Sequence, residues 1–411
     1  MNSRERFIRS LEGRDHDYPP LICWCFGFKP DPSLLWNNSG GLVNYWYTMR
    51  LEHIHTLPIP WSIEDDFKRV EKWQELGVDD ILDVSVPWGI DDSVKVEDKL
   101  EKDEKAGCIL LIRNYFTPAG RLEHVVKKTG EKVEPGWVIQ PNFVPLFEDY
   151  NIPRAVKHAV SGVEDIELVR FLYRSPDKDT DKSFKARMEK VSSFAKAKGV
   201  PVQAWSAFGM DAVVWLCGVE GSIFMAMDNE NAFQSLVETI FETDYARTEL
   251  ACQTDVDIIV QRGWYSSTDF WSPELFNKFC IPFVQKLSDL VHNYKKKFAY
   301  VVTTGVEIIG PELVEAGVDL IYFIDPVQDK ITLERAVELF GGRVAVAGGI
   351  NTTALSKMNK SEIEFSVERA LRMLGGSGRF ILQPVDALFP DTPWEKVKAL
   401  IDSWKKYRSS W

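Results

Sequence analysis

Short apolar runs alternate with longer amphipathic stretches along most of the chain. Near-continuous apolar runs are typical of parallel strands that are buried on both faces, and helices are the usual connections between such strands. The last two runs enclose a single helical pattern, as a strand, helix, strand unit requires. Eight runs are predicted to be strands, at about Pro20 to Cys25, Asp79 to Val84, Pro201 to Ser206, Val256 to Gln261, Phe298 to Thr303, Val318 to Ile324, Arg343 to Gly348 and Arg379 to Gln383.

Eight alternating units favour an α/β fold of the closed (β/α)8, TIM-like barrel class over an open doubly wound sheet. No Gly-x-Gly-x-x-Gly turn follows a predicted strand, as a dinucleotide-binding sheet would need. Helix start signals follow several runs: Thr392-Pro-Trp-Glu395 orders a capping residue, a first-turn proline and a reciprocating glutamate, and Ser272-Pro-Glu repeats the first part. We therefore predict one barrel domain over residues 1–411.

One region departs from this alternation. Roughly a hundred residues separate the second and third predicted strands, far more than the few residues of an ordinary loop. Gly107 to Phe116 and Arg121 to Thr129 alternate apolar and polar residues around Thr117-Pro-Ala-Gly120, which predicts a β-hairpin. We expect an insertion at residues 90–150 beside the catalytic rim, either as a wall or lid of the site or as a structural flap.

Composition narrows the class of protein. The chain of 411 residues is 45% hydrophobic and carries a net charge of -12, without a long Lys/Arg run, which argues against nucleic acid and anionic membrane as partners. No apolar segment is expected to span a bilayer, and the N-terminus mixes charges where a signal peptide is apolar. Six cysteines form neither a disulfide framework nor a zinc-finger spacing. We expect a cytoplasmic protein, and leave a homodimer open.

The most informative position is Asp386. It follows the last predicted strand in Pro384-Val-Asp386, so it falls on the rim at which barrel enzymes carry out their chemistry. The other aspartates at predicted strand ends are Asp83, Asp269 and Asp325.

Several motifs resemble the uroporphyrinogen decarboxylase superfamily, which includes cobamide-dependent methyltransferases. Arg4-Glu-Arg-Phe-Ile-Arg-Ser-Leu-Glu-Gly13, followed by Asp17-Tyr-Pro-Pro20, is similar to its opening helix and first strand. The resemblance continues through Tyr115-Phe-Thr-Pro-Ala-Gly120, Ser272-Pro-Glu-Leu-Phe276, Glu315-Ala-Gly-Val-Asp319, Ala347-Gly-Gly349 and Phe389-Pro-Asp-Thr-Pro393. It covers nearly the whole chain and implies a TIM-like barrel with its site at the carboxyl ends of the strands.

The motifs of two branches of this superfamily are incomplete here. The decarboxylases carry an arginine-rich first loop, a serine that aligns with Ser266, and a late histidine. The first loop here reads Trp24-Cys-Phe-Gly-Phe-Lys-Pro30, and the histidine position holds Asp386, so decarboxylation of uroporphyrinogen is not expected. Thiol-activating methyltransferases carry a His-x-Cys zinc pair and a later cysteine; here Val302-Thr-Thr-Gly305 and Asp386 stand in their places. That zinc site is absent, and a carboxylate-bound metal stays open.

The resemblance therefore implies a third branch, the methyltransferases that take a methyl group from an ether and pass it to the cobalt of a separate corrinoid protein. A methoxylated aromatic suits the aromatic residues expected at the rim, because such side chains hold a flat ring. The leaving phenolate needs a positioned acid, for which Asp386 and Asp269 lead and Asp83 follows. Ser266 is a further candidate, and Asp325 a substrate contact. The expected substrate-binding residues are completed by Trp24, Phe26, Trp88, Trp205, Phe208, Thr303 and Thr304.

Each candidate has a competing structural interpretation. Most of the 14 tryptophans must serve ordinary packing, Asp325-Pro326 is also a turn signal, and Asp83 is equally suited to a paired loop position. A decarboxylase or lyase acting on a small aromatic acid would use the same aspartates with a cation at the rim, from Arg113, Arg121 or Arg262. A non-catalytic ligand-binding barrel would need no acid at all.

Overall fold

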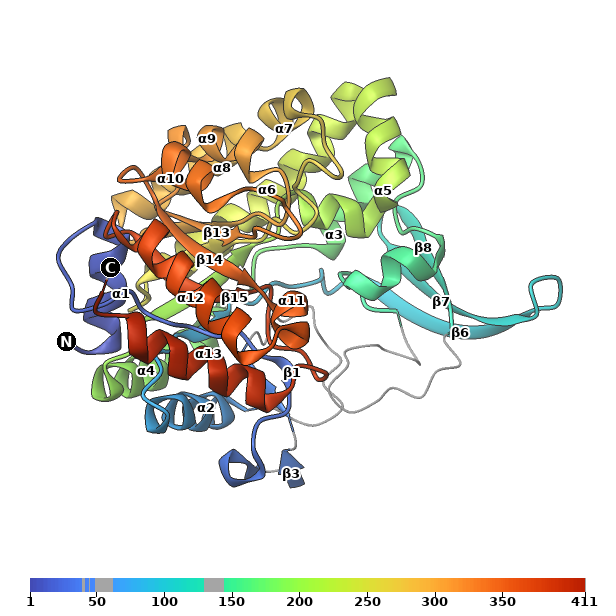
Figure 1. The fold of residues 1–411 in the computed structure, drawn as a ribbon. Coiled ribbons are helices and arrows are strands. Elements are labelled where there is room, and N and C mark those ends of the chain that lie inside the picture. Colours follow the sequence, from blue (N-terminus) through green and yellow to red (C-terminus); the bar gives the residue numbers. More distant parts are fainter. Residues whose placement is uncertain (39–40, 44, 49–61, 129–143, 411) are drawn as a thin grey trace.

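The computed structural model describes residues 1–38, 41–43, 45–48, 62–128 and 144–410. Seven parallel strands form a curved sheet in the order β15-β14-β13-β12-β11-β10-β5. Each strand overlaps one predicted run, and the TIM-like α/β barrel class is confirmed (Figure 1). The strands are β5 Leu82–Ser85, β10 Val202–Ala207, β11 Ile258–Gln261, β12 Lys297–Val301, β13 Leu320–Ile324, β14 Ala345–Asn351 and β15 Phe380–Val385.

The first predicted strand takes the place beside β15, but as two isolated parallel bridges instead of a continuous ladder. Leu21 pairs with Leu382, and Cys25 pairs with Leu388. Pro384 lies between the two pairing positions and has no N–H to donate, so it interrupts the ladder there.

Helices cover the outside of the sheet and connect successive strands (Figure 1). Ser272 caps α7 as predicted, since its side chain accepts the N–H of Leu275. The cap predicted at Thr392 is wrong. Helix α13 begins at Trp394, and the Thr392 hydroxyl accepts the N–H of Phe389 at 3.0 Å instead of capping the helix. The helices are α1 Ser3–Glu12, α2 Ile63–Glu75, α3 Ile166–Leu172, α4 Lys178–Lys198, α5 Met210–Asp228, α6 Glu230–Cys252, α7 Pro273–Phe279, α8 Ile281–Asn293, α9 Val306–Glu315, α10 Leu333–Phe340, α11 Thr352–Lys357, α12 Lys360–Gly375 and α13 Trp394–Tyr407, with 3-10 turns η1 Pro32–Leu34, η2 Asp149–Arg154 and η3 Val163–Asp165.

The barrel interior is filled by aliphatic side chains and a cluster of aromatic rings. Trp24 lies at the centre of this packing, with its ring centroid 5.4 Å from that of Trp205 and 4.8 Å from that of Tyr322. All three side chains are almost completely buried. The interior is therefore a packed core, and any ligand must bind above it at the rim.

The insertion forms a separate antiparallel sheet, β6-β7-β8-β9, which reaches away from the barrel on the right of Figure 1. The predicted hairpin is present, with Thr117 of β7 paired to Gly120 of β8; Thr129 of that prediction lies outside the described residues. The strand β6, mostly charged and exposed, carried too few apolar residues to be predicted. These strands are β6 Lys95–Asp103, β7 Cys108–Thr117, β8 Gly120–Lys127 and β9 Ala155–Lys157, and the short ribbons near the N-terminus are β1 Phe26–Phe28, β2 Trp36–Asn38, β3 Gly41–Val43 and β4 Trp46–Tyr47.

One described helix, α5, is long and apolar enough to cross a membrane by length and composition alone, which the sequence analysis did not anticipate. However, 67% of its apolar window is buried inside the protein, and the backbone leaves the helical conformation at Gly218 (φ 70°). These features are those of a core helix that packs against α6.

Candidate active site

A cavity of about 450 Å³ lies at the carboxyl-terminal rim of the barrel. Its walls come from the segments after β11 and β15, from β1, from α5 and from the end of the insertion. Most of its lining is aromatic or aliphatic, with four charged groups among it. The lining residues are Phe26, Glu148, Asp149, Tyr150, Ile152, Pro153, Val219, Arg262, Trp264, Tyr265, Phe270, Asp386, Ala387 and Phe389.

Asp386 is partly buried in the wall of this cavity, directly after β15. Burial raises the pKa of its carboxyl to about 6, against the opposing effects of a hydrogen bond from Trp264 and the charge of Arg262. The indole Nε1 of Trp264 donates that bond to Oδ2 at 3.2 Å. A carboxyl with this pKa is present in both protonation states near neutral pH, so it can supply a proton to a ligand.

Arg262 follows β11 and lies between two tryptophan rings, 4.4 Å from the centroid of Trp264 and 4.8 Å from that of Trp215. Its Nε donates to Asp211 at 3.2 Å, and its Nη2 is 3.4 Å from Asp149 Oδ1. Two carboxylates thus offset the guanidinium charge.

Asp211, in the first turn of α5, also holds the loop after β11 in place. Its carboxylate accepts the backbone N–H groups of Trp264 at 3.2 Å and Tyr265 at 2.9 Å. Burial raises the pKa of Asp211 to about 6, against the charge of Arg262. The two rings that wall the cavity on this side are therefore positioned by one buried carboxylate.

Glu148 lines the cavity at the end of the insertion, just before η2, and the residue is only 2% exposed. Burial raises the pKa of its carboxyl to about 8, and the neighbouring charge of Asp149 adds to that effect. Oε1 accepts the N–H of Tyr150 at 3.3 Å, whereas Oε2 has no hydrogen-bond partner in the described part of the chain.

The sequence of residues 146–407 matches the model of the uroporphyrinogen decarboxylase (URO-D) family. These residues make up well over half of the chain. The chain belongs to the uroporphyrinogen decarboxylase family. The matched region includes every charged residue of the rim cavity, and the resemblance inferred from the motifs is confirmed.

Among solved structures, a methyltransferase from Methanosarcina mazei has the same fold, with a TM-score of 0.55 at 15% sequence identity and 99% of each chain covered. A 3-keto-D-glucoside 4-epimerase from E. coli gives a TM-score of 0.35 at 10% identity, over 62% of this chain and 97% of the other. No curated protein matches the sequence.

Of the predicted catalytic residues of this URO-D family member, Asp386 alone lines the cavity. Asp83 lies in the barrel interior, where its Oδ1 accepts Gln203 Nε2 and Trp205 Nε1, both at 2.6 Å. Burial raises the pKa of Asp83 to about 7, against those two hydrogen bonds.

The other two predicted catalytic residues lie in the loop after β11. Ser266 is buried, and its hydroxyl is 3.3 Å from Asp211 Oδ1. Asp269 is exposed and accepts the hydroxyl of Thr304 at 2.7 Å. Neither side chain lines the cavity.

The predicted substrate contacts are divided among three places. Phe26 lines the cavity, whereas Trp24 and Trp205 fill the barrel interior beneath it. Phe208 and Trp88 pack in the outer core, each against Phe147 and Tyr173, with ring centroids 5.1 to 5.6 Å apart in that group.

The remaining predicted contacts serve the loops at the strand ends. The Thr303 hydroxyl donates to the carbonyl of Trp264 at 3.2 Å. Asp325 accepts the N–H of Val327 at 2.8 Å, as its turn interpretation predicted, and Asn351 Nδ2 at 2.7 Å.

The three candidate cations are also separated. Arg113 pairs with Asp98 at 2.6 Å, and Arg121 bonds Asn114 at 2.6 Å, both within the sheet of the insertion. Arg262 is the candidate that reaches the rim cavity. In the described ranges, no group of three or more His, Cys, Asp or Glu side chains is arranged to hold a metal ion.

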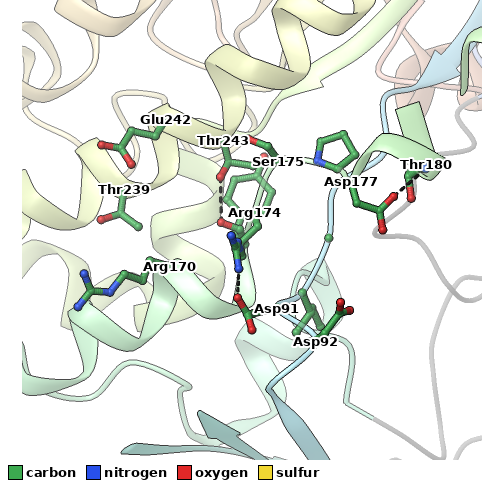
Figure 2. Close-up of a pocket in the computed structure, with 14 residues that line it drawn as sticks. Asp91, Asp92, Arg170, Arg174, Ser175, Asp177, Thr180, Thr239, Glu242 and Thr243 are labelled. Atoms are coloured by element: carbon green, nitrogen blue, oxygen red, sulfur yellow. Dashed lines mark hydrogen bonds and ion pairs between the residues drawn. The ribbon is translucent and has the colours of Figure 1, made fainter. Parts of the chain in front are cut away.

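A second cavity of about 500 Å³ lies on the flank of the barrel, between α3, α6 and the start of α4 (Figure 2). Among its charged groups, Arg174 forms an ion pair with Asp91, and Asp177 accepts the backbone N–H of Thr180 at 2.7 Å. It contains none of the residues that follow β11 or β15. The rim cavity is therefore the better candidate for the active site.

Sequence reasoning missed Glu148, Asp149 and Asp211. Asp211 left a usable signal, because it falls in the first helical turn after a predicted strand, where barrel enzymes place functional side chains. Glu148 and Asp149 left none, since they lie at the end of an insertion whose path a periodic pattern does not define.

Proposed function

We propose that this member of the family is a methyltransferase that demethylates a methoxylated aromatic compound and passes the methyl group to the cobalt of a separate corrinoid protein. One observation carries the proposal: the rim cavity combines aromatic walls with a partly buried aspartate whose pKa is raised to about 6. The fold shared with the Methanosarcina mazei methyltransferase supports it.

The size and lining of the cavity suit the proposed methyl donor. A volume of about 450 Å³ is within the range that small-molecule sites usually have. Phe26 and Phe389 form an edge-to-face pair with ring centroids 6.2 Å apart, and Trp264 stands beside Asp386. Rings in such positions hold a flat aromatic ligand by stacking and edge contacts.

The proposed chemistry is displacement at the methyl carbon. The corrinoid, carried by its own protein, supplies the nucleophilic reduced cobalt. The O–CH₃ bond breaks with its electron pair left on oxygen, and Asp386 donates a proton to that oxygen, which avoids expulsion of a free phenolate. Asp211 and Arg262 act indirectly, by fixing Trp264 and Tyr265 at the cavity wall.

The alternative of thiol activation by zinc does not fit the residues present. The segment Val302-Thr-Thr-Gly305 resembles the place at which that branch has its His-x-Cys pair, and it holds neither residue type. The hydroxyls of Thr303 and Thr304 donate to Trp264 O and to Asp269. Zinc in proteins is bound by thiolate, imidazole and carboxylate ligands.

A decarboxylase of a small aromatic acid is the second candidate, because the guanidinium of Arg262 reaches the cavity. Asp211 and Asp149 offset its charge, which weakens its attraction for a substrate carboxylate. We therefore rank this function below demethylation.

The test is incubation of the purified protein with anisole, the three methoxyphenols and 4-methoxybenzoate, in the presence of free cob(I)alamin. Demethylation predicts the absorbance of methylcobalamin together with an equimolar demethylated product. Release of CO₂ from the benzoate, without methylcobalamin, would favour the decarboxylase. Binding of these compounds without either product would reject both enzymatic functions and favour a non-catalytic ligand-binding barrel.

A further inference from the structure

Glu148 carries a buried hydrogen-bonding atom that has no partner in the described part of the chain. Of the buried side-chain atoms without a partner in the described ranges, Glu148 Oε2 is the one whose residue lines the rim cavity. Others, such as Asp83 Oδ2 and both ring nitrogens of His124, belong to residues away from that cavity. A buried polar atom without a partner destabilises the folded protein, so a ligand that pairs with it recovers that lost free energy.

The carboxyl of Glu148 is held in a fixed place. Its Oε1 accepts the N–H of Tyr150 at 3.3 Å, and its carbonyl oxygen accepts the N–H of Asn151 at 3.1 Å. The side chain of Asn151 in turn donates to the carbonyl of Pro145 at 2.9 Å. Because the main chain on both sides of Glu148 is tied down, the carboxyl of this cavity-lining residue is held in a defined position, with Oε2 buried and without a partner in the described part of the chain.

We propose that Glu148 selects the methyl donor by hydrogen bonding to a second, neutral oxygen substituent on its aromatic ring, either a hydroxyl or another methoxyl group. The inference rests on the proposed function for the nature of the methyl donor. Asp386 and Glu148 then divide the cavity: the first serves the ether oxygen that leaves, and the second serves an oxygen elsewhere on the ring.

The protonation state of Glu148 agrees with this selection. Burial and the charge of Asp149 raise its pKa to about 8, so the carboxyl is largely protonated at pH 7. A neutral carboxyl donates through its O–H and accepts through its other oxygen, so it pairs with a hydroxyl or an ether oxygen. A site built around such a group discriminates strongly against an analogue without the partner, because the buried group is then left unpaired.

Calorimetric binding of matched ligands tests the inference without any need for turnover. The ligands are 2-, 3- and 4-methoxyphenol, each compared with the methylanisole in which a methyl group replaces the hydroxyl at the same position. We expect at least one methoxyphenol to bind the wild-type protein about tenfold to a hundredfold more tightly than its methylanisole. The variant Glu148→Met, which fills similar space without a hydrogen-bonding group, should bind both members of the pair equally.

Two further variants complete the experiment. Glu148→Gln keeps hydrogen-bonding atoms in place and should retain part of the preference, and it replaces the Met variant if that one does not fold. Glu164→Gln, at an exposed glutamate on η3, should keep the full preference. No preference in the wild type, or a full preference in Glu148→Met, overturns the inference.

The methyl-transfer assay, run with the same ligands, separates this inference from the proposed function. Selective binding without methyl transfer from any ligand would reject demethylation and leave the selecting role of Glu148. Methyl transfer at equal rates with and without the second substituent would support demethylation and reject the selecting role of Glu148.

Discussion

Asp83 and Asp386 are both buried enough for the pKa to be raised well above its ordinary value, yet their surroundings differ. In the barrel interior, Asp83 Oδ1 accepts two short hydrogen bonds, from Gln203 and Trp205, and its pKa is about 7. At the rim, Asp386 accepts one longer bond from Trp264 and faces a cavity, and its pKa is about 6. A raised pKa therefore marks burial, and access to a cavity is what makes such a group a candidate for chemistry.

The largest expected difference between the two aspartates is in turnover. Asp386→Asn removes the proposed proton donor at nearly constant volume and should lower kcat for demethylation by about 10²- to 10⁴-fold. Asp83→Asn should change kcat by less than about threefold, because no ligand reaches the barrel interior. Product formation by both variants, measured with 2-methoxyphenol, checks this prediction.

The exposed Asp391, five residues after Asp386, provides the matched control Asp391→Asn, which should keep wild-type turnover. Equal losses in the Asp83 and Asp386 variants would mean that the barrel interior takes part in the reaction. Full turnover in Asp386→Asn would remove the acid from the mechanism.

The second difference is in stability. The pKa of Asp83 is about 7 in the folded protein, against an ordinary value of 3.8, so between those pH values the folded state retains a proton that the unfolded chain has lost. The free energy of unfolding therefore falls as the pH rises from about 4 through 7. Asp83→Asn should abolish this part of the fall, and at pH 8.5 it should be more stable than wild type by on the order of 2–4 kcal/mol.

Urea unfolding at pH 5, 7 and 8.5 measures this effect, with Asp402→Asn on the exposed face of α13 as a control that should follow the wild type. Near pH 5 the Asp83 variant should be no more stable than wild type, since the amide that replaces Oδ2 also has no partner there. Parallel curves for wild type and Asp83→Asn at all three pH values would contradict the prediction.

The third difference concerns Trp264, which donates a hydrogen bond to Asp386. Trp264→Phe keeps a ring in the cavity wall but removes the N–H that stabilises the ionised carboxyl, so the pKa of Asp386 should rise further. If protonated Asp386 is the acid, the basic limb of the kcat profile should move upward by about half to one pH unit. A limb that moves downward, or stays in place, would show that another group sets it.

The barrel was predictable from the sequence because each of its strands is a short apolar run between polar segments, and seven such runs became ladders. Depth along a strand was less predictable. Trp24 and Trp205 were expected at the rim and fill the interior, since aromatic character indicates burial without indicating height along the barrel axis.

Contacts between distant segments were not predictable at all. Asp211 accepts the backbone N–H of Tyr265, 54 positions away, and Arg262 donates a hydrogen bond to Asp149, 113 positions away. Such pairs are made by the closure of the barrel and by the docking of the insertion, and neither leaves a local pattern. Asp386 was found in advance because its position follows from a strand end alone.

The smallest expected effect tests whether the polar group around Asp83 is purely structural. The hydroxyl of Tyr322 donates to Gln203 Oε1 at 3.1 Å, and Gln203 in turn donates to Asp83. Tyr322→Phe removes one buried hydrogen bond and should lower the free energy of unfolding by about 1–2 kcal/mol, measured by urea unfolding at pH 7. Turnover should stay within about twofold of wild type, because the ring itself still packs against Trp24 and supports the cavity floor. A loss of turnover that approaches that of Asp386→Asn would show that the barrel interior contributes to the reaction. Asp83 and Asp386 could then no longer be separated into a structural and a catalytic aspartate.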